Sequence, residues 1–202
     1  MLRLLSLAIL AAALAAQAHA ADWQTRANAY KRELIREARA EMGLDAPVAM
    51  LAAQIHQESL WRPNARSKYA NGLTQFTPET EAWIKQVFPV ALGSGHAFEP
   101  RWAIRALVKY DNWLYQRIDA ADDCNRWAMV LSAYNGGLGW LNRDKKLAAQ
   151  RGADARRWWG HVERHSRRAK WAIAENRGYP RAIIYKHQQL YHSWGGVAVC
   201  AP

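Results

Sequence analysis

The chain has 202 residues, which is enough for one domain with a hydrophobic core. It carries 28 Lys and Arg against 17 Asp and Glu, so its formal net charge is +11, while 50% of its residues are hydrophobic. No internal repeat, low-complexity linker or long strand-like alternation interrupts it, which excludes a repeat protein and a disordered chain. Two cysteines are too few to hold a metal ion by themselves.

The first 20 residues have the three parts of a secretory signal peptide. A positive start at Arg3 precedes an apolar stretch, residues 4–16, and a small-x-small cleavage site at residues 18–20. We therefore expect residues 1–20 to be removed, and residues 21–202 to act as a single periplasmic or secreted domain. The alternative is an uncleaved N-terminal anchor, although the apolar stretch is short for a transmembrane helix.

The basic character of the chain would survive this cleavage, because only Arg3 would be lost. An exported basic protein is attracted to polyanions, and outside the cytoplasm these are cell-wall polymers and anionic lipid surfaces. We therefore expect no nucleic acid partner and, after cleavage, no stable membrane span. A basic surface without a dedicated partner is the open alternative.

Cys124 and Cys200 are the two cysteines of the chain. In an oxidising compartment they can pair, and the bond would tie the C-terminal tail to the middle of the domain. Two cysteines define no geometry on their own, so a disulfide and two free thiols both stay open.

The mature chain has the pattern of a series of helices. The first covers residues 22–42, with Asp22 as its cap and Gly43 at its end. Asp45 can cap the second helix, whose apolar stripe is typical of a buried segment. Residues 61–77 are rich in loop-forming residues and could hold a short hairpin.

Two further helices are expected after this loop. One begins at Pro78, with Thr77 as its cap. Residues 89–95 have the composition of a second loop. Residues 99–118 form the clearest amphipathic helix of the chain.

The C-terminal part also has helical spacing. A helix capped by Asp122 or Asp123 ends at residues 136–137, and two basic helical segments follow. The last helix is expected over residues 179–194, with Pro180 in its first turn. Together these patterns predict one all-α domain.

Glu58 is the strongest candidate for chemistry. It stands three residues after Ile55 at the end of the buried helix, so its carboxyl belongs to the apolar side, whereas Gln54 and Gln57 are expected nearer to solvent. An apolar surround raises the pKa of a carboxyl and keeps it protonated, which suits proton donation to a leaving group. A structural Glu paired with an Arg is the alternative. Trp61, in the polar loop that follows, is a candidate for stacking on a sugar ring.

Several short motifs occur in the order found in a known family. They are Glu58-Ser59, Pro63-Asn64-Ala65-x-Ser67, Gly72-Leu73-Thr74-Gln75-x-x-Pro78, Ala133-Tyr134-Asn135-Gly136-Gly137 and Glu175-x-x-x-Tyr179-Pro180-x-x-Ile183. Together they closely resemble the soluble lytic transglycosylase family, over about residues 45–185. The resemblance implies a lysozyme-like fold of the goose type, in which packed helices surround a substrate cleft.

The resemblance also implies roles for individual residues. Glu58 would be the single catalytic acid and base, and Ser59 would orient the substrate beside it. Tyr179 would approach Glu58 from the last helix. The other expected substrate-binding residues are Thr74, Gln75, Tyr134 and Asn135. Thr74 and Asn176 depart from the family, which usually has Met and commonly has Thr at these positions, so the cleft is expected to differ in shape near Thr74.

The reaction implied is non-hydrolytic cleavage of the β-1,4 bond between N-acetylmuramic acid and N-acetylglucosamine, giving a 1,6-anhydro end without a cofactor or metal. The expected partners are peptidoglycan glycan strands, with a cell-envelope assembly as a further candidate. The alternatives are a lysozyme-type hydrolase on the same fold and a non-catalytic wall-binding or assembly protein.

Ordinary glycosidases need a pair of carboxylates, and we expect no partner carboxylate for Glu58. The nearest alternatives are Glu79 and Glu81. Both stand at the start of a helix, where acidic residues favour the helix dipole.

His161 and His165 are spaced i, i+4, which on a helix can bind a metal ion. We expect no metal here, because no third ligand is near and several arginines crowd the pair. The surrounding basic run, residues 151–170, is typical of a solvated helix face. Contact with anionic wall polymer is the alternative.

Overall fold

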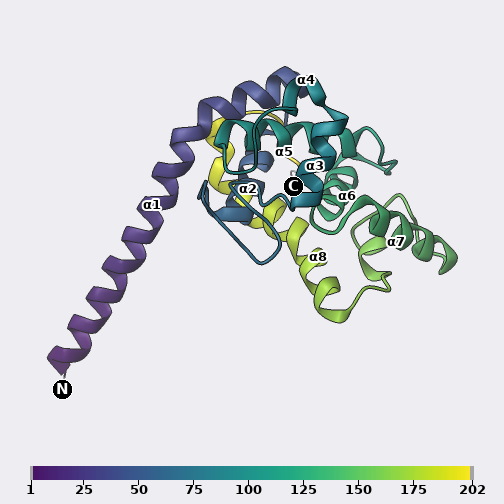
Figure 1. Cartoon of the computed structure of the whole chain (residues 1–202). Coiled ribbons are helices and arrows are strands. Elements are labelled where there is room, and N and C mark those ends of the chain that lie inside the picture. Colours follow the sequence, from purple (N-terminus) through teal and green to yellow (C-terminus); the bar gives the residue numbers. More distant parts are fainter. Residues whose placement is uncertain (1, 201–202) are drawn as a thin grey trace.

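A computed structural model describes the chain from residue 2 to residue 200, with side chains from Asp22 onward. Within this part the regular structure is helical and the β contacts are isolated bridges, so the predicted all-α class is confirmed (Figure 1). In chain order the elements are α1 (Leu2–Met42), α2 (Val48–Ser59), α3 (Pro78–Val87), α4 (Pro89–Leu92), α5 (Pro100–Tyr115), α6 (Asp123–Gly136), α7 (Leu138–Gln150), η1 (Val162–Arg164), α8 (Lys170–Ala182), η2 (Ile183–His187) and η3 (Gln188–Trp194).

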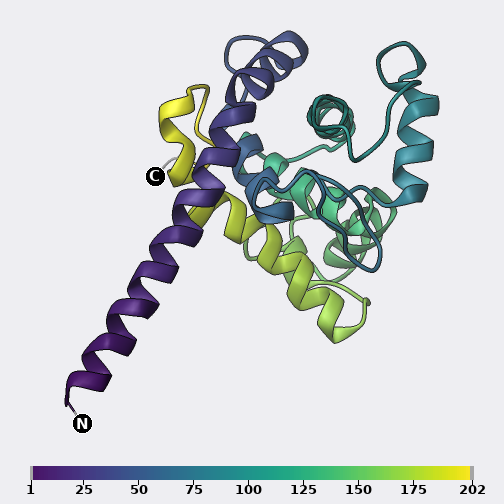
Figure 2. The ribbon, with the colours of Figure 1, turned by 60° about the vertical axis from the view of Figure 1, so that its left-hand side comes forward.

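Helix α1 is longer than predicted, because it begins at Leu2 rather than at Asp22. Its N-terminal half projects away from the other helices (Figures 1 and 2). The side chains of the predicted signal peptide, residues 1–20, lie outside the described part, so that assignment stays a prediction. Within the described residues, no helix combines the length and the apolar character that crossing a membrane requires.

Helix α2 is the buried centre of the domain. Ten of its 12 residues are buried, and it packs against α1, η2 and η3. A helix that is apolar on all sides is stable only when other elements cover it. Two details differ from the prediction. Pro47, not Asp45, occupies the N-cap position, and Gln54 is fully buried, with its Nε2 3.5 Å from Oδ1 of Asp111.

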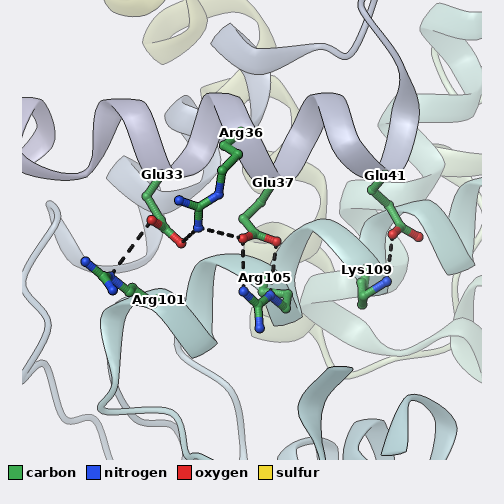
Figure 3. Close-up of polar contacts among 7 residues, drawn as sticks. All are labelled: Glu33, Arg36, Glu37, Glu41, Arg101, Arg105 and Lys109. Carbon is green, nitrogen blue, oxygen red and sulfur yellow. Dashed lines mark hydrogen bonds and ion pairs between the residues drawn. The ribbon is translucent and has the colours of Figure 1, made fainter. Parts of the chain in front are cut away.

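A row of ion pairs fastens α1 to α5 (Figure 3). Its members, spaced one turn apart on each helix, are Glu33, Glu37 and Glu41 on α1 and Arg101, Arg105 and Lys109 on α5. The N–O distances are 4.0 Å for Glu33–Arg101, 3.1 Å for Glu37–Arg105 and 2.7 Å for Glu41–Lys109. Arg105 donates two hydrogen bonds to Glu37, a two-point contact that fixes geometry better than a single charge pair. Because the residue numbers of the paired residues increase together along α1 and α5, the two helices run in the same direction here.

Residues 61–77 form a loop without strands, since their antiparallel contacts are isolated bridges. Gly72 is required in this loop: its φ is +76°, and an added Cβ would meet the carbonyl oxygen of Ala97 at 1.8 Å. The loop ends at Thr77, whose Oγ1 accepts a hydrogen bond from the backbone N–H of Thr80 at 3.1 Å. The predicted cap of α3 is therefore confirmed.

Two predicted boundaries are wrong. The expected loop over residues 89–95 contains the short helix α4, which begins at Pro89. Tyr179 and Pro180 lie inside α8 rather than at the start of a last helix. Because proline has no N–H to donate to the preceding turn, the α-helical pattern does not continue for long after it, and the chain passes into the π turn η2 and the 3-10 helix η3.

The basic run, residues 151–170, is not the helix face that its sequence suggested. It consists mostly of turns, with Gly152 and Gly160 at positive φ and one short 3-10 turn, η1. His161 and His165 flank that turn, so they do not share a helix face. The helical premise for a metal pair is therefore wrong.

The structure contains a disulfide between Cys124, at the start of α6, and Cys200. The two Cα atoms are 4.7 Å apart and the sequence separation is 76 residues. Asp122 caps the same end of α6, because its side chain accepts a hydrogen bond from the N–H of Asn125. The C-terminal tail is thus fastened to the start of a core helix.

Reduction of this disulfide should lower the free energy of unfolding by about 2–4 kcal/mol, because the open tail regains chain entropy in the unfolded state. Urea denaturation with and without dithiothreitol measures the change. The variant Cys124→Ser/Cys200→Ser should not respond to the reductant. An unfolding midpoint of the wild-type chain that is independent of reductant would contradict the expectation.

Candidate active site

A cleft of about 680 Å³ is lined by residues of the 61–77 loop, α6 and α8, together with Glu58 at the end of α2. The lining residues that belong to the predicted site are Glu58, Gln75, Tyr134 and Asn135. Segments that are distant in the sequence therefore meet around the one carboxyl singled out by the motif analysis.

Glu58 is held by Tyr179, whose hydroxyl donates a hydrogen bond to Oε1. Burial raises the pKa of Glu58 to about 8, because a carboxylate that is withdrawn from water loses hydration. The bond from Tyr179 lowers this pKa, and the negative charge of Glu175 raises it. The net result is a carboxyl that is mainly protonated at neutral pH.

A second carboxyl, Asp111 of α5, lies within electrostatic range of Glu58. It is fully buried, and its Oδ2 has no hydrogen-bond partner among the described residues. Burial first, and the charge of Glu58 second, raise the pKa of Asp111 well above its usual value. The sequence analysis named only Glu79 and Glu81 as other carboxyls and missed Asp111. The signal was present in the sequence, since Asp111 stands four residues after Leu107 on the apolar face of α5.

Ser59 and Thr74 take part in hydrogen bonds that hold the 61–77 loop in place. The Ser59 hydroxyl donates to the carbonyl oxygen of Leu73 at 2.7 Å. The carbonyl oxygen of Thr74 accepts a hydrogen bond from the hydroxyl of Tyr134, also at 2.7 Å. The Ser59 and Thr74 side chains are buried and are not among the lining residues of the cleft. Their contacts join the loop to α2 and α6.

Amide side chains stabilise the 61–77 loop and join α6 to α8 at the cleft. Gln75 donates through Nε2 to the carbonyl oxygen of Gly72 at 2.9 Å. Asn176 of α8 donates through Nδ2 to Oδ1 of Asn135 at 3.0 Å, and it exchanges hydrogen bonds with Ser132. The buried Asn176 thereby fixes the middle of α8 against the end of α6.

Backbone strain is concentrated next to Glu58. Leu60, Trp61 and Gln75 have φ values of 52°, 62° and 49°, which non-glycine residues adopt only when the surroundings hold them. Trp61 is held by burial and by a hydrogen bond from its Nε1 to the hydroxyl of Tyr191 at 2.7 Å. The prediction that Trp61 stacks on a sugar is therefore wrong, because its ring is part of the core.

Other aromatic residues line the cleft with exposed rings. The exposed fractions are 67% for Tyr69, 36% for Trp140 and 72% for Trp171. Amphipathic rings of this kind can cover an apolar face of a ligand while their polar edge stays in contact with water. The sequence analysis missed all three. The available signal was that Trp171 stands among charged and small residues rather than in an apolar stripe.

Residues 33–156 match the family model described as "Transglycosylase SLT domain". The chain is 32% identical over 155 residues to membrane-bound lytic murein transglycosylase F 1 of Alkalilimnicola ehrlichii, covering 74% of this chain and 29% of that protein. It is 36% identical over 110 residues to membrane-bound lytic murein transglycosylase F of Shewanella pealeana, covering 54% of this chain and 21% of that protein. The chain thus spans less than a third of the length of these curated relatives.

The fold is similar to that of the 70-kDa soluble lytic transglycosylase solved in complex with bulgecin A. The TM-score is 0.58 at 21% sequence identity, over 86% of this chain and 26% of that chain. The resemblance to soluble lytic transglycosylases and the lysozyme-like fold, both predicted from the sequence, are confirmed.

Asp111→Asn should stabilise the protein at neutral pH. Because the folded-state pKa of Asp111 is raised, the wild-type chain has its full stability below the unfolded pKa of about 4 and loses stability as pH rises above it. Asn keeps an acceptor for Gln54 without this cost, so the gain should be on the order of 1–3 kcal/mol at pH 7 and near zero at pH 3. Urea denaturation at both pH values measures it. A loss of stability at pH 7 would show that Asp111 is ionised and paired.

Proposed function

The chain belongs to the transglycosylase SLT domain family, and we propose that it is a lytic transglycosylase that cleaves the bond between N-acetylmuramic acid and N-acetylglucosamine in peptidoglycan. The observation that carries this proposal is Glu58, a desolvated carboxyl that lines the cleft with a pKa raised to about 8. A carboxylic acid that is neutral at the working pH is equipped to protonate a leaving-group oxygen.

In the first step, Glu58 donates its proton to the oxygen that links the two sugars, and the bond from that oxygen to C1 of the muramic acid breaks. Positive charge develops at C1, and the substrate's own acetamido oxygen stabilises it. Exposed rings of Trp140 and Trp171, and the polar groups of Gln75 and Asn135, are available in the cleft to hold the strand.

In the second step, Glu58 is the base. Its carboxylate takes the proton of the C6 hydroxyl, and the C6 oxygen forms a bond to C1, which gives a 1,6-anhydro end and returns Glu58 to its protonated form. No water is consumed. The hydrogen bond from Tyr179 stabilises the carboxylate that forms when Glu58 gives up its proton, and it therefore supports Glu58 as the acid of the first step.

A lysozyme-type hydrolase on the same fold is the second candidate. The observation in its favour is Glu175, an exposed carboxylate that lines the same cleft and could activate water. Asp111 is less suited to that role because it is buried and its pKa is raised well above the usual value. Glu79 and Glu81, the alternatives considered from the sequence, are not among the lining residues.

We further propose that the mature domain, residues 21–202, acts outside the cytoplasm on glycan strands after removal of residues 1–20. The disulfide between Cys124 and Cys200 supports an oxidising compartment. A cell-envelope assembly is a further candidate partner.

Glu58→Gln should abolish cleavage while preserving the fold, because Gln cannot transfer a proton but can still accept the hydrogen bond from Tyr179. The measurement is mass spectrometry of the fragments released from purified peptidoglycan. Wild-type products should be lighter by one water at the muramic acid end. Reducing ends would identify a hydrolase, and unchanged cleavage by the variant would remove Glu58 from the mechanism.

Tyr179→Phe should shift the pH dependence of cleavage. Loss of its hydrogen bond removes an interaction that lowers the pKa of Glu58, so the acid stays protonated to higher pH and the alkaline limb of the kcat/KM profile moves upward. The rate should also fall by roughly tenfold, because Glu58 loses its anchor. The profile of the variant is compared with that of wild type between pH 5 and pH 10. A shift to lower pH would contradict this role of Tyr179.

A further inference from the structure

A second pocket, of about 420 Å³, adjoins the cleft along α7. Its lining residues are Trp140, Arg143, Asp144, Lys146, Leu147, Gln150 and Arg167. Trp140 and Arg167 line the cleft as well, so a ligand that occupies the cleft at this end lies beside the second pocket.

Most of the net charge of the chain is found in this region. Residues 140–170 contain ten Lys and Arg and three Asp and Glu, an excess of seven positive charges out of a total of +11. On α5, by contrast, Arg101, Arg105 and Lys109 face the carboxylates of α1 (Figure 3). The unbalanced positive charge is therefore concentrated next to the end of the cleft.

The cations of the second pocket are available to a ligand. Within the described part of the chain, Arg143, Lys146 and Arg167 are exposed and have no hydrogen bond or ion pair from their side chains. The one acid of the pocket, Asp144, is buried and forms an ion pair with Arg168 at 3.1 Å, so it does not compete for them.

Contacts between side chains order the wall of the second pocket. The guanidinium carbon of Arg143 lies 4.8 Å from the ring centroid of Trp140, and that of Arg168 lies 5.6 Å from it. Contacts of this kind hold both the ring and the cations in place. Leu147 and Gln150 add an apolar and an amide surface to the same pocket.

We propose that this second pocket binds the carboxylates of a peptide stem carried by the glycan strand in the cleft. The inference rests on the proposed function. Sugars linked by glycosidic bonds carry no charge once the lactyl group of muramic acid is joined to its peptide, so the cleft alone needs no cations. The free carboxylates of the strand belong to its stems. A stem that leaves the strand beside Trp140 reaches a pocket that offers cations, an apolar side chain and an amide.

The binding test uses Glu58→Gln, so that cleavage does not consume the ligand. Its affinity for intact peptidoglycan is measured by co-sedimentation and compared with its affinity for the same peptidoglycan after carbodiimide coupling to ammonia has converted the stem carboxylates to neutral amides. We expect tighter binding to the intact material, by about five- to tenfold, and loss of this preference in 0.5 M NaCl.

Two sets of charge variants are added to Glu58→Gln. Arg143→Gln with Lys146→Gln removes two cations of the pocket. Arg151→Gln with Arg164→Gln removes two exposed cations of the same basic region that do not line it. The first pair should reduce the preference for peptidoglycan with free stem carboxylates to less than about twofold, and the second should leave this preference intact.

Equal binding to intact and amidated peptidoglycan, or equal effects of the two variant pairs, would overturn the proposal. So would a preference for vesicles of phosphatidylglycerol that the pocket variants abolish while stems make no difference, because the ligand would then be a phosphate. Wild-type cleavage of intact peptidoglycan is measured separately. Its absence would overturn the proposed function, whereas the stem preference of the inactive variant would still stand.

Discussion

The withdrawal of the Glu58 carboxyl from water is the constraint on which the rest of this site depends. Burial disfavours the ionised form, and none of the groups that shift its pKa is a cation, although the chain as a whole is strongly basic. A Lys or Arg beside Glu58 would lower its pKa and leave a carboxylate with no proton to give. The buried neighbours are instead Tyr179, which donates one hydrogen bond, and Asp111, whose own pKa is raised by burial.

Burial of this carboxyl and the strained turn after it destabilise the folded domain. Interactions away from the cleft offset this loss of stability. The turn after Glu58 is held in a left-handed conformation by packing of Trp61 against η3. The ion-pair row between α1 and α5 and the disulfide at the start of α6 act at other points of the domain. The desolvated Glu58 carboxyl therefore lies in a domain whose stability does not require an opposite charge next to it.

Local patterns in the sequence predict most of the helices and some of their starts, because caps and apolar stripes act within one or two turns. Thr77 and the buried α2 are examples. What could not be predicted depends on packing between distant segments. Trp61 is buried because Tyr191 of η3 reaches it, and Asp111 becomes a neighbour of Glu58 only when α5 packs in the same core. The family motifs singled out Glu58 as the candidate, since five short patterns in one order are far more specific than any single one.

The most direct test of the account is the pKa of Glu58 in the folded protein. Carbon-13 NMR of the chain labelled at glutamate side-chain carboxyls, titrated from pH 3 to pH 10, gives this value, and the spectrum of Glu58→Gln assigns the resonance. The account predicts a midpoint near pH 8. A midpoint near the ordinary value of 4.5 would mean that Glu58 is ionised at neutral pH, and it would contradict the role of this residue as the acid.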